Sequence, residues 1–205
     1  MHSSKKLFVQ CLSILFIFNS LNIVAQDNEE SVEEVVVTGS YIKGSPTDGA
    51  SPVEIINRDE INNLNASTIA DITANIAVNS GSENNPDSFT QGATQGTSNI
   101  NLRGLGLSST LVLVDGKRHT LASSTANDGS VFVNTSSIPV IALDRVEVLK
   151  EGAASIYGSD AVAGVVNYIL RKDFTGLEVT VSSQEADVGG QTDDRVGVIW
   201  GAEKD

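Results

Sequence analysis

The sequence is short of several residue types, and each shortage excludes a class of protein. Cysteine occurs once, at Cys11, so no disulfide within the chain can stabilise the fold. With 13 basic and 26 acidic residues the formal net charge is -13, and nucleic acid is an unsuitable partner because phosphate contacts require clustered Lys and Arg. Heptads and long repeat periods are missing, which excludes coiled coils and solenoids. A globular chain rich in glycine and polar residues remains.

The longest apolar run lies at the start of the chain. It spans residues 7–18, follows Lys5 and Lys6, and is followed by the small residue Ala25. A helix across a bilayer needs roughly 20 residues, so this run is too short to be a membrane span. The order of basic, apolar and small residues predicts a secretory signal peptide over residues 1–25, cleaved after Ala25. Cleavage removes Cys11 and both lysines, which changes the net charge from -13 to -15.

Residues 26–38 are expected to be a flexible lead-in, because the acidic stretch lacks apolar periodicity. Near its end stand three β-branched residues, Val35, Val36 and Val37. Such a run is compatible with an ordinary first strand. On a polar tether it is also suited to pairing with the edge of another protein's sheet.

Residues 39–175 have the pattern of an α+β domain, with a small mixed sheet, short helices and long polar loops. Asp115 and Gly116 predict a tight hairpin turn toward Arg118, because both residue types tolerate positive φ. Single helical turns are expected over residues 138–143, with Pro139 in the first turn, and just before Gly158. Apolar and β-branched runs predict strands at residues 53–56, 111–114, 145–150 and 164–170.

Two short helices are expected after the first strand. Asp59 is the predicted N-cap of a helix that ends at Leu64, and a second helix begins at Ser67 or Thr68. The apolar residues of the second helix are spaced by three and four and share one face for core packing: Ile69, Ile72 and Ile76. Residues 80–99 and 120–131 are polar loops, and loops this long are usually functional or disordered.

The character of the sequence changes after residue 176, where apolar and polar residues alternate in two runs around Gly189 and Gly190. This is the weak signature of transmembrane barrel strands, although a soluble hairpin fits these thirty residues about as well. Trp200 suits the aromatic girdle at a membrane interface. Residues 176–205 are therefore either the first strand or strands of a barrel or a soluble hairpin.

Catalytic, dinucleotide and metal sites are poorly supported. A triad would have to use Asp115, His119 and a nearby serine, but no Gly-x-Ser-x-Gly elbow accompanies them. Gly104 and Gly106 start a glycine pattern that Ser109 does not complete. No cluster of His or Cys suggests a metal site, and the Asp-Gly pairs lack the spacing of a calcium loop. We expect neither an enzyme nor a cofactor.

Several motifs occur in one order along the chain: Asn-Leu-Arg-Gly at residues 101–104, then the runs 111–118, 144–158 and 159–167. Together with the early Glu-Val-Val-Val-Thr-Gly they resemble the plug domain of TonB-dependent outer-membrane receptors, over nearly the whole mature chain. The resemblance implies a plug inside a barrel of about 22 strands. It also implies energised uptake of a siderophore, cobalamin or carbohydrate in the outer membrane of a Gram-negative bacterium.

The resemblance also implies roles for named residues. The TonB box, which pairs with TonB in the periplasm, corresponds to Glu34, Val35, Val36, Val37 and Thr38. Arg103 and Lys150 correspond to cations that face acidic residues of the barrel wall, although Lys150 replaces the commoner Arg and so lacks its bidentate geometry. The outward loops would present ligand-contacting residues, namely Asn84, Phe89, Gln91 and Gln95.

A free-standing soluble periplasmic binding module with the plug fold is the alternative, and the alternating tail favours the receptor. Closing a barrel of about 22 strands at roughly 10 residues each needs over 200 residues. The tail offers far fewer, so we expect the printed sequence to be a fragment. Two strands alone cannot close a barrel or form a pore.

Overall fold

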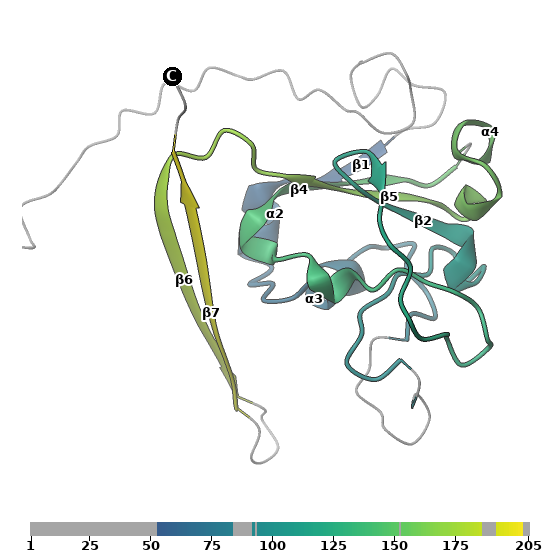
Figure 1. The fold of residues 1–205 in the computed structure, drawn as a ribbon, viewed down its shortest axis with the longest axis horizontal. Coiled ribbons are helices and arrows are strands. Elements are labelled where there is room, and N and C mark those ends of the chain that lie inside the picture. Colours follow the sequence, from purple (N-terminus) through teal and green to yellow (C-terminus); the bar gives the residue numbers. More distant parts are fainter. Residues whose placement is uncertain (1–52, 84–91, 93, 152, 186–191, 203–205) are drawn as a thin grey trace, which may run out of the picture. The chain divides into compact units, whose positions relative to one another are not determined.

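The computed structural model describes residues 53–83, 92, 94–151, 153–185 and 192–202 (Figure 1). Its main feature is a five-stranded mixed sheet with the order β1-β4-β5-β2-β3. The central strand β5 pairs parallel with β2 and antiparallel with β4. The four predicted strands are confirmed as β1 (Val53–Ile56), β2 (Thr110–Val114), β4 (Leu143–Leu149) and β5 (Gly164–Leu170), although β2 begins one residue earlier than predicted and β4 covers 143–149 rather than 145–150. The fifth strand is β3 (Lys117–Arg118).

Side chains alternate between the two faces of the sheet along each strand, and each face packs against a buried cluster. Val112 of β2 packs with helices α2 (Arg58–Asn63) and α3 (Ile69–Ala74) in the larger core cluster, whereas Leu111 and Leu113 belong to a second cluster on the opposite face. The second cluster includes Ala153 and Ala161, beside the helical turns α4 (Ala154–Tyr157) and η5 (Ser159–Ala161). Figure 1 shows α2 and α3 on one side of β4 and β5, and α4 at the far end.

The first helix begins two residues earlier than the sequence predicts. Its N-cap is Asn57, not Asp59, because Asn57 and Glu60 form a reciprocal capping box in which each side chain accepts from the other residue's backbone N–H, both at 2.9 Å. Asp59 lies in the first turn instead. The predicted end at Leu64 is confirmed as the C-cap.

The second helix begins after Thr68, one of the two predicted N-caps, and ends at Ala74. Ile69 and Ile72 are buried as expected. Ile76 lies beyond the last helical residue but is also buried, so the predicted apolar face continues into the following turn.

Backbone geometry confirms the predicted hairpin turn and corrects one detail elsewhere. Asp115 and Gly116 both have positive φ, 50° and 75°, as a tight turn between β2 and β3 requires. Pro139 precedes the 3-10 turn η4 (Val140–Ala142) as its N-cap rather than lying inside its first turn. Gly158 ends α4 with φ 95°, in agreement with the predicted glycine stop. Two further 3-10 turns are η2 (Leu107–Ser109) and η3 (Thr135–Ser137).

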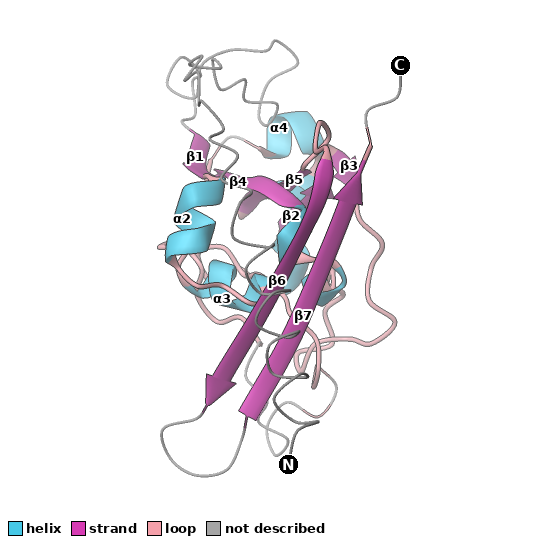
Figure 2. Cartoon of the chain, turned by 90° about the vertical axis from the view of Figure 1, so that its left-hand side faces the viewer, coloured by secondary structure: helices cyan, strands magenta, loops and turns pink. Residues whose placement is uncertain are grey.

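The alternating tail forms an antiparallel hairpin of two ten-residue strands, β6 (Gly176–Glu185) and β7 (Thr192–Gly201). Figure 2 shows these strands side by side. The predicted turn at Gly189 and Gly190 lies outside the described residues. Across the described part of the chain, no helix has the length and apolar character needed to cross a membrane.

Candidate functional site

Most residues of the predicted TonB box and ligand loops lie outside the described ranges. This applies to all five TonB-box residues, 34–38, and to Asn84, Phe89 and Gln91. Gln95 is described and is exposed next to the buried Thr94. These roles therefore stay predictions.

The bases of the two polar loops are joined by hydrogen bonds. Glu83, in the loop of residues 80–99, accepts from the backbone N–H of Asn127 in the other loop through both carboxylate oxygens at 3.3 Å. Ser98 accepts from Thr135, immediately after the second loop, and both residues are buried. Residues 120–131 also enclose a small core of their own, with Ala126 and Phe132 buried against Leu107. The described ends of the first loop are therefore bonded to the second loop and to the segment that follows it.

The two predicted barrel-facing cations have different surroundings. Arg103 is exposed, has φ 59°, and donates from Nη2 to the carbonyl oxygen of Val162 at 2.8 Å. Among the described residues it has no acidic partner. Lys150 instead forms an ion pair with Glu54 of β1, with Nζ 2.6 Å from Oε2. Of these two cations, only Arg103 therefore has a charge that no described acidic residue neutralises.

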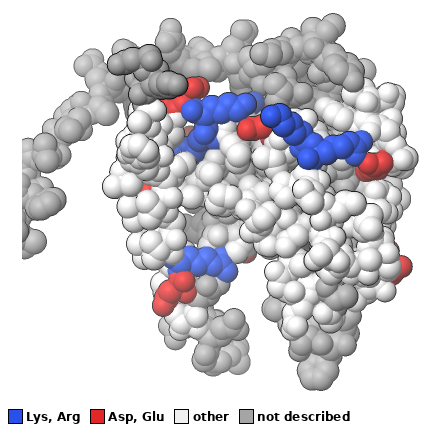
Figure 3. All heavy atoms as spheres, viewed as in Figure 1, with Lys and Arg blue, Asp and Glu red and all other residues white. Residues whose placement is uncertain are grey.

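Several other described cations form ion pairs with acidic side chains, and Figure 3 shows blue and red pairs on one face. Arg118 pairs with Asp160 and also donates to the carbonyl oxygen of Tyr157 at 2.6 Å, which fixes α4 and η5 against the β3 edge. His119, the only histidine outside the predicted signal peptide, has its Nδ1 3.2 Å from the carbonyl oxygen of Thr120. Among the described residues no group of His, Cys, Asp and Glu is arranged to hold a metal ion.

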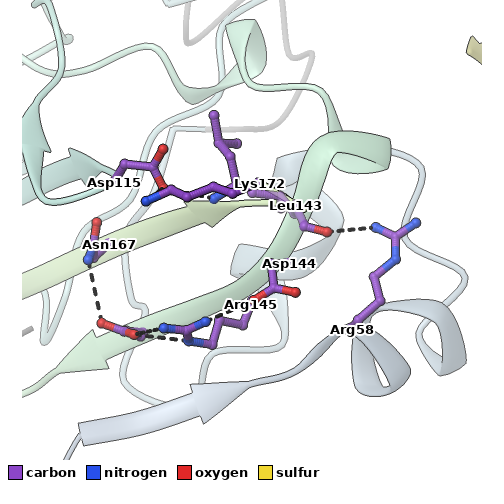
Figure 4. A network of polar contacts seen from close by, with 9 residues as sticks. Arg58, Asp115, Leu143, Asp144, Arg145, Asn167 and Lys172 are labelled. Atoms are coloured by element: carbon purple, nitrogen blue, oxygen red, sulfur yellow. Dashed lines mark hydrogen bonds and ion pairs between the residues drawn. The ribbon is translucent and has the colours of Figure 1, made fainter. Parts of the chain in front are cut away.

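A buried carboxylate lies within the sheet (Figure 4). Glu147 on β4 is fully buried and pairs with Arg145, whose Nη2 is 2.9 Å from Oε1. Asn167 on β5 donates to Glu147 at 3.4 Å and accepts from the backbone N–H of Gly116 at 3.0 Å. Because an isolated buried charge would be strongly unfavourable, these contacts make the network a structural unit that ties β4, β5 and the β2–β3 turn together.

A second polar cluster joins the sheet to the hairpin. Arg58 at the start of α2 donates from Nη1 to the carbonyl oxygens of Val140 at 2.8 Å and Leu143 at 3.2 Å. Its Nη2 lies 3.5 Å from Oε1 of Glu178 on β6, and Arg171 lies 2.8 Å from Oε2 of the same carboxylate. We call these three charged residues, Arg58, Arg171 and Glu178, the Glu178 cluster. No local sequence pattern indicates it, since Arg58 and Glu178 are 120 residues apart.

The two faces of the hairpin differ in chemistry. The outer face is apolar and 56–73% exposed: Leu177, Val179, Val181, Val196, Val198 and Trp200. The inner face makes contacts with the sheet domain, where Arg195 donates to Ser67 Oγ at 2.8 Å and an added Cβ at Gly197 would lie 3.3 Å from Ile141 Cδ1. A groove of about 700 Å³ lies between this inner face and the α2–α3 connection.

A family profile described as TonB-dependent Receptor Plug Domain matches residues 45–165. The iron-regulated outer membrane virulence protein of Vibrio cholerae serotype O1 is 29% identical over 155 residues, which are 75% of this chain and 22% of that protein. Among solved structures, the siderophore receptor PirA from Acinetobacter baumannii is 28% identical with a TM-score of 0.52, covering 71% of this chain and 21% of that one.

The ferric citrate transporter FecA in its unliganded form gives a TM-score of 0.58 at 24% identity, covering 73% of this chain and 22% of that one, and shows the shared fold. The chain thus spans about a fifth of the length of the relatives that it matches. Its mixed sheet with few short helices is the fold of the corresponding part of these receptors.

Proposed function

Since the chain belongs to the family of TonB-dependent receptor plug domains, we propose that it forms the plug and the first two barrel strands of an outer-membrane receptor. The complete receptor takes up a ligand with energy delivered through TonB. The observation that carries the proposal is the combination of a plug sheet with a hairpin whose outer face is apolar and exposed. A free-standing periplasmic module would have no use for such a face.

The hairpin has the alternation that a barrel wall needs, with apolar side chains toward lipid and polar ones toward the lumen. Cross-strand neighbours Leu177 and Trp200 lie on the outer face, whereas Ser182 and Arg195 lie on the inner one. Strands of ten residues are long enough to cross the hydrocarbon core at the tilt usual in barrels.

We assign residues 34–38 as the TonB box on sequence grounds. A β-branched run without proline, on an acidic tether that precedes the sheet, can add as a strand to a sheet edge of TonB. In that mode backbone donors and acceptors supply the contact, so the side chains matter less than an unbroken row of N–H groups.

The experiment that tests the proposal uses the complete receptor carrying Val36→Pro. Proline removes a backbone donor from the strand, so energised uptake should be lost while ligand binding at the cell surface is retained. Val36→Thr keeps both the N–H and the β-branch and is the matched control. Normal uptake by the proline variant would refute the assignment.

For the ligand we propose a small iron chelate of low charge. The relatives include receptors named for siderophores and ferric citrate. In this chain, residues 80–102 and 119–131 contain no Lys or Arg, while Glu83, Asp87 and Asp128 are acidic. Like charges at close range repel, so these loops favour a neutral chelate over a polyanionic one.

Uptake of radioactive iron separates the two ligand classes. Cells with the complete receptor should accumulate iron from a neutral ferric hydroxamate and not from a trianionic ferric catecholate. The reverse preference would contradict the ligand assignment without affecting the receptor assignment.

A further inference from the structure

Arg103 has a backbone conformation that its residue type does not favour. Across the described residues, three residues other than glycine have positive φ, and the other two are Asn65 and Asp115, whose short polar side chains tolerate it. Arg103 has φ 59° and is exposed, so packing of its own side chain does not impose this conformation. Contacts of the neighbouring residues therefore have to hold it.

Three hydrogen bonds fix the turn around Arg103. Its backbone N–H donates to the carbonyl oxygen of Val78 at 2.6 Å, and its guanidinium donates to that of Val162 at 2.8 Å. Three residues later, the backbone N–H of Gly106 donates to Asn101 Oδ1 at 3.0 Å. An unfavourable φ persists when the surroundings impose it. If these bonds loosen, Arg103 can return to negative φ, so the turn has a second conformation within reach.

Asn101, which opens the Asn-Leu-Arg-Gly motif, joins this turn to the base of the first polar loop, residues 80–99. It is 7% exposed and uses both ends of its side-chain amide. Oδ1 accepts from Gly106 in the turn, whereas Nδ2 donates to the carbonyl oxygen of Gly81 in the loop at 3.3 Å. One N–H and one carbonyl partner define which way the amide points. A single buried side chain therefore contacts both segments.

Two further asparagines stiffen the loop base. Asn79 Oδ1 accepts from the Ser82 hydroxyl at 2.5 Å and from the backbone N–H of Asn101 at 3.0 Å. Asn99, 1% exposed, accepts from the backbone N–H of Glu83 at 2.8 Å and donates to its carbonyl oxygen at 3.3 Å. Polar networks with satisfied members are rigid. A movement of the loop base is therefore passed toward the turn rather than absorbed within the loop.

We infer that Asn101 is a positioning residue that holds Arg103 in its left-handed conformation and couples it to the base of the first polar loop. A displacement of Gly81 withdraws the acceptor of Asn101 Nδ2. The side chain then loses its fixed position, the bond to Gly106 loosens, and Arg103 can leave positive φ. One consequence rests on the proposed receptor function: a ligand that displaces this loop would weaken the proposed contact of Arg103 with the barrel wall.

Two glycine variants of the complete receptor test the coupling from the loop side. Gly81 and Gly96 lie in the same loop with φ of 76° and 75°, so alanine strains both alike. At Gly81 the added Cβ would lie 3.4 Å from Asn101 Nδ2, whereas at Gly96 no described atom lies within 4 Å. Gly81→Ala should speed hydrogen exchange of residues 104–106 about fivefold, as expected for the loss of one hydrogen bond. Gly96→Ala should leave this exchange unchanged, and equal exchange in the two variants would overturn the coupling.

Coupling between two sites is reciprocal, so the turn side offers a second test. Arg103→Ala should speed hydrogen exchange of residues 80–83 about twofold or more. Arg118→Ala is the matched control, because this arginine also donates from Nη2 to a backbone carbonyl, that of Tyr157 at 2.6 Å, but lies at the β3 edge. It should leave residues 80–83 unchanged. Unchanged exchange of these residues in Arg103→Ala would show that the turn and the loop are independent.

Asn101→Asp separates positioning from a merely structural role. Its carboxylate keeps an acceptor for Gly106 but loses the donor to Gly81, so it cuts the loop from the turn while the turn stays held. In this background Arg103→Ala should no longer change the exchange of residues 80–83. Effects that simply multiply would refute Asn101 as the link.

If the buried charge of Asn101→Asp prevents folding, the comparison of Gly81→Ala with Gly96→Ala decides by itself. Hydrogen exchange needs neither ligand nor energised uptake. Failure of the receptor assignment has a different signature, since it would appear as normal uptake by Val36→Pro and would leave the exchange results as they are.

Discussion

Gly164 begins the central strand β5 where two other segments leave no room for a side chain. Its φ is 135°, a value that other residues rarely adopt. An added Cβ would lie 2.5 Å from the carbonyl oxygen of Leu149 and 2.7 Å from Leu102 Cδ1. Neither neighbour can move aside, because both are buried and Leu149 belongs to β4. One glycine thus permits the close approach of β4 and β5.

Gly164→Ala should therefore lower the free energy of unfolding by about 3 kcal/mol or more, since backbone strain and overpacking act together. Gly129→Ala is the matched control, with φ 82° and open space around the new Cβ. Backbone strain alone should lower the free energy of unfolding of the Gly129→Ala variant by about 1 kcal/mol. Urea unfolding of the mature chain measures both, and equal losses would show that the contact with β4 is unimportant.

At the scale of elements, the short helix α3 depends on its N-terminal cap. Ser67 and Thr68 together give Asp71 Oδ2 three hydrogen bonds, from the two backbone N–H groups and the Ser67 hydroxyl, at 2.8 to 3.1 Å. Burial by itself raises the pKa of Asp71, but the hydrogen bonds with Thr68 and Ser67 outweigh it, and the pKa lies below its usual value. The ionised carboxylate is the form that stabilises the helix start.

This predicts a pH dependence with a definite sign. The pKa is lower in the folded chain than in the unfolded chain, so the stabilisation is complete above the unfolded value of about 3.9 and is lost as the pH falls through the folded value. Asp71→Asn should be less stable than wild type at neutral pH, and the difference should shrink below about pH 4. Unfolding followed at several pH values checks this, with the exposed Asp59→Asn as control. A constant difference would contradict it.

Elements specified by neighbouring residues are the ones that the sequence predicts well. Asp115 and Gly116 predict the hairpin turn because both positive φ values belong to the turn itself. The start of α2 is missed by two residues because Asn57 and Asp59 are both good caps, and the choice depends on Glu60 standing three residues after Asn57. The Glu178 cluster is missed altogether, since no local pattern links α2 to a strand near the end of the chain.

At the scale of the whole molecule, the described cations are largely neutralised from within. Lys150, predicted to face the barrel wall, has Glu54 as a partner in its own sheet. Arg103 has a single backbone acceptor, Val162, and no acidic partner among the described residues. Of these two predicted wall contacts, that of Arg103 is therefore the one for which the described residues supply no acidic alternative.

If Arg103 pairs with acidic wall residues as the resemblance implies, Arg103→Ala in the complete receptor should loosen the plug by about 1 to 3 kcal/mol, because it leaves those carboxylates unpaired. Leakage of small solutes across the membrane should rise accordingly. Lys150→Ala should have the smaller effect, since its charge is already neutralised by Glu54. Solute efflux from liposomes containing each variant measures the difference. Equal leakage from the Arg103 variant and wild type would show that this arginine is only a surface charge and does not hold the plug in place.

The sheet order also governs when the domain can fold. β5 lies in the middle of the sheet but is the last of its strands to be made, and Thr110 pairs with Gly164 across 54 residues. Such long-range parallel pairing forms slowly. When the chain is synthesised from its N-terminus, the strand pairs β1–β4 and β2–β3 therefore stay separate until β5 is completed at residue 170. The late central strand therefore delays the closed core until residue 170 has been made, six residues before β6 begins.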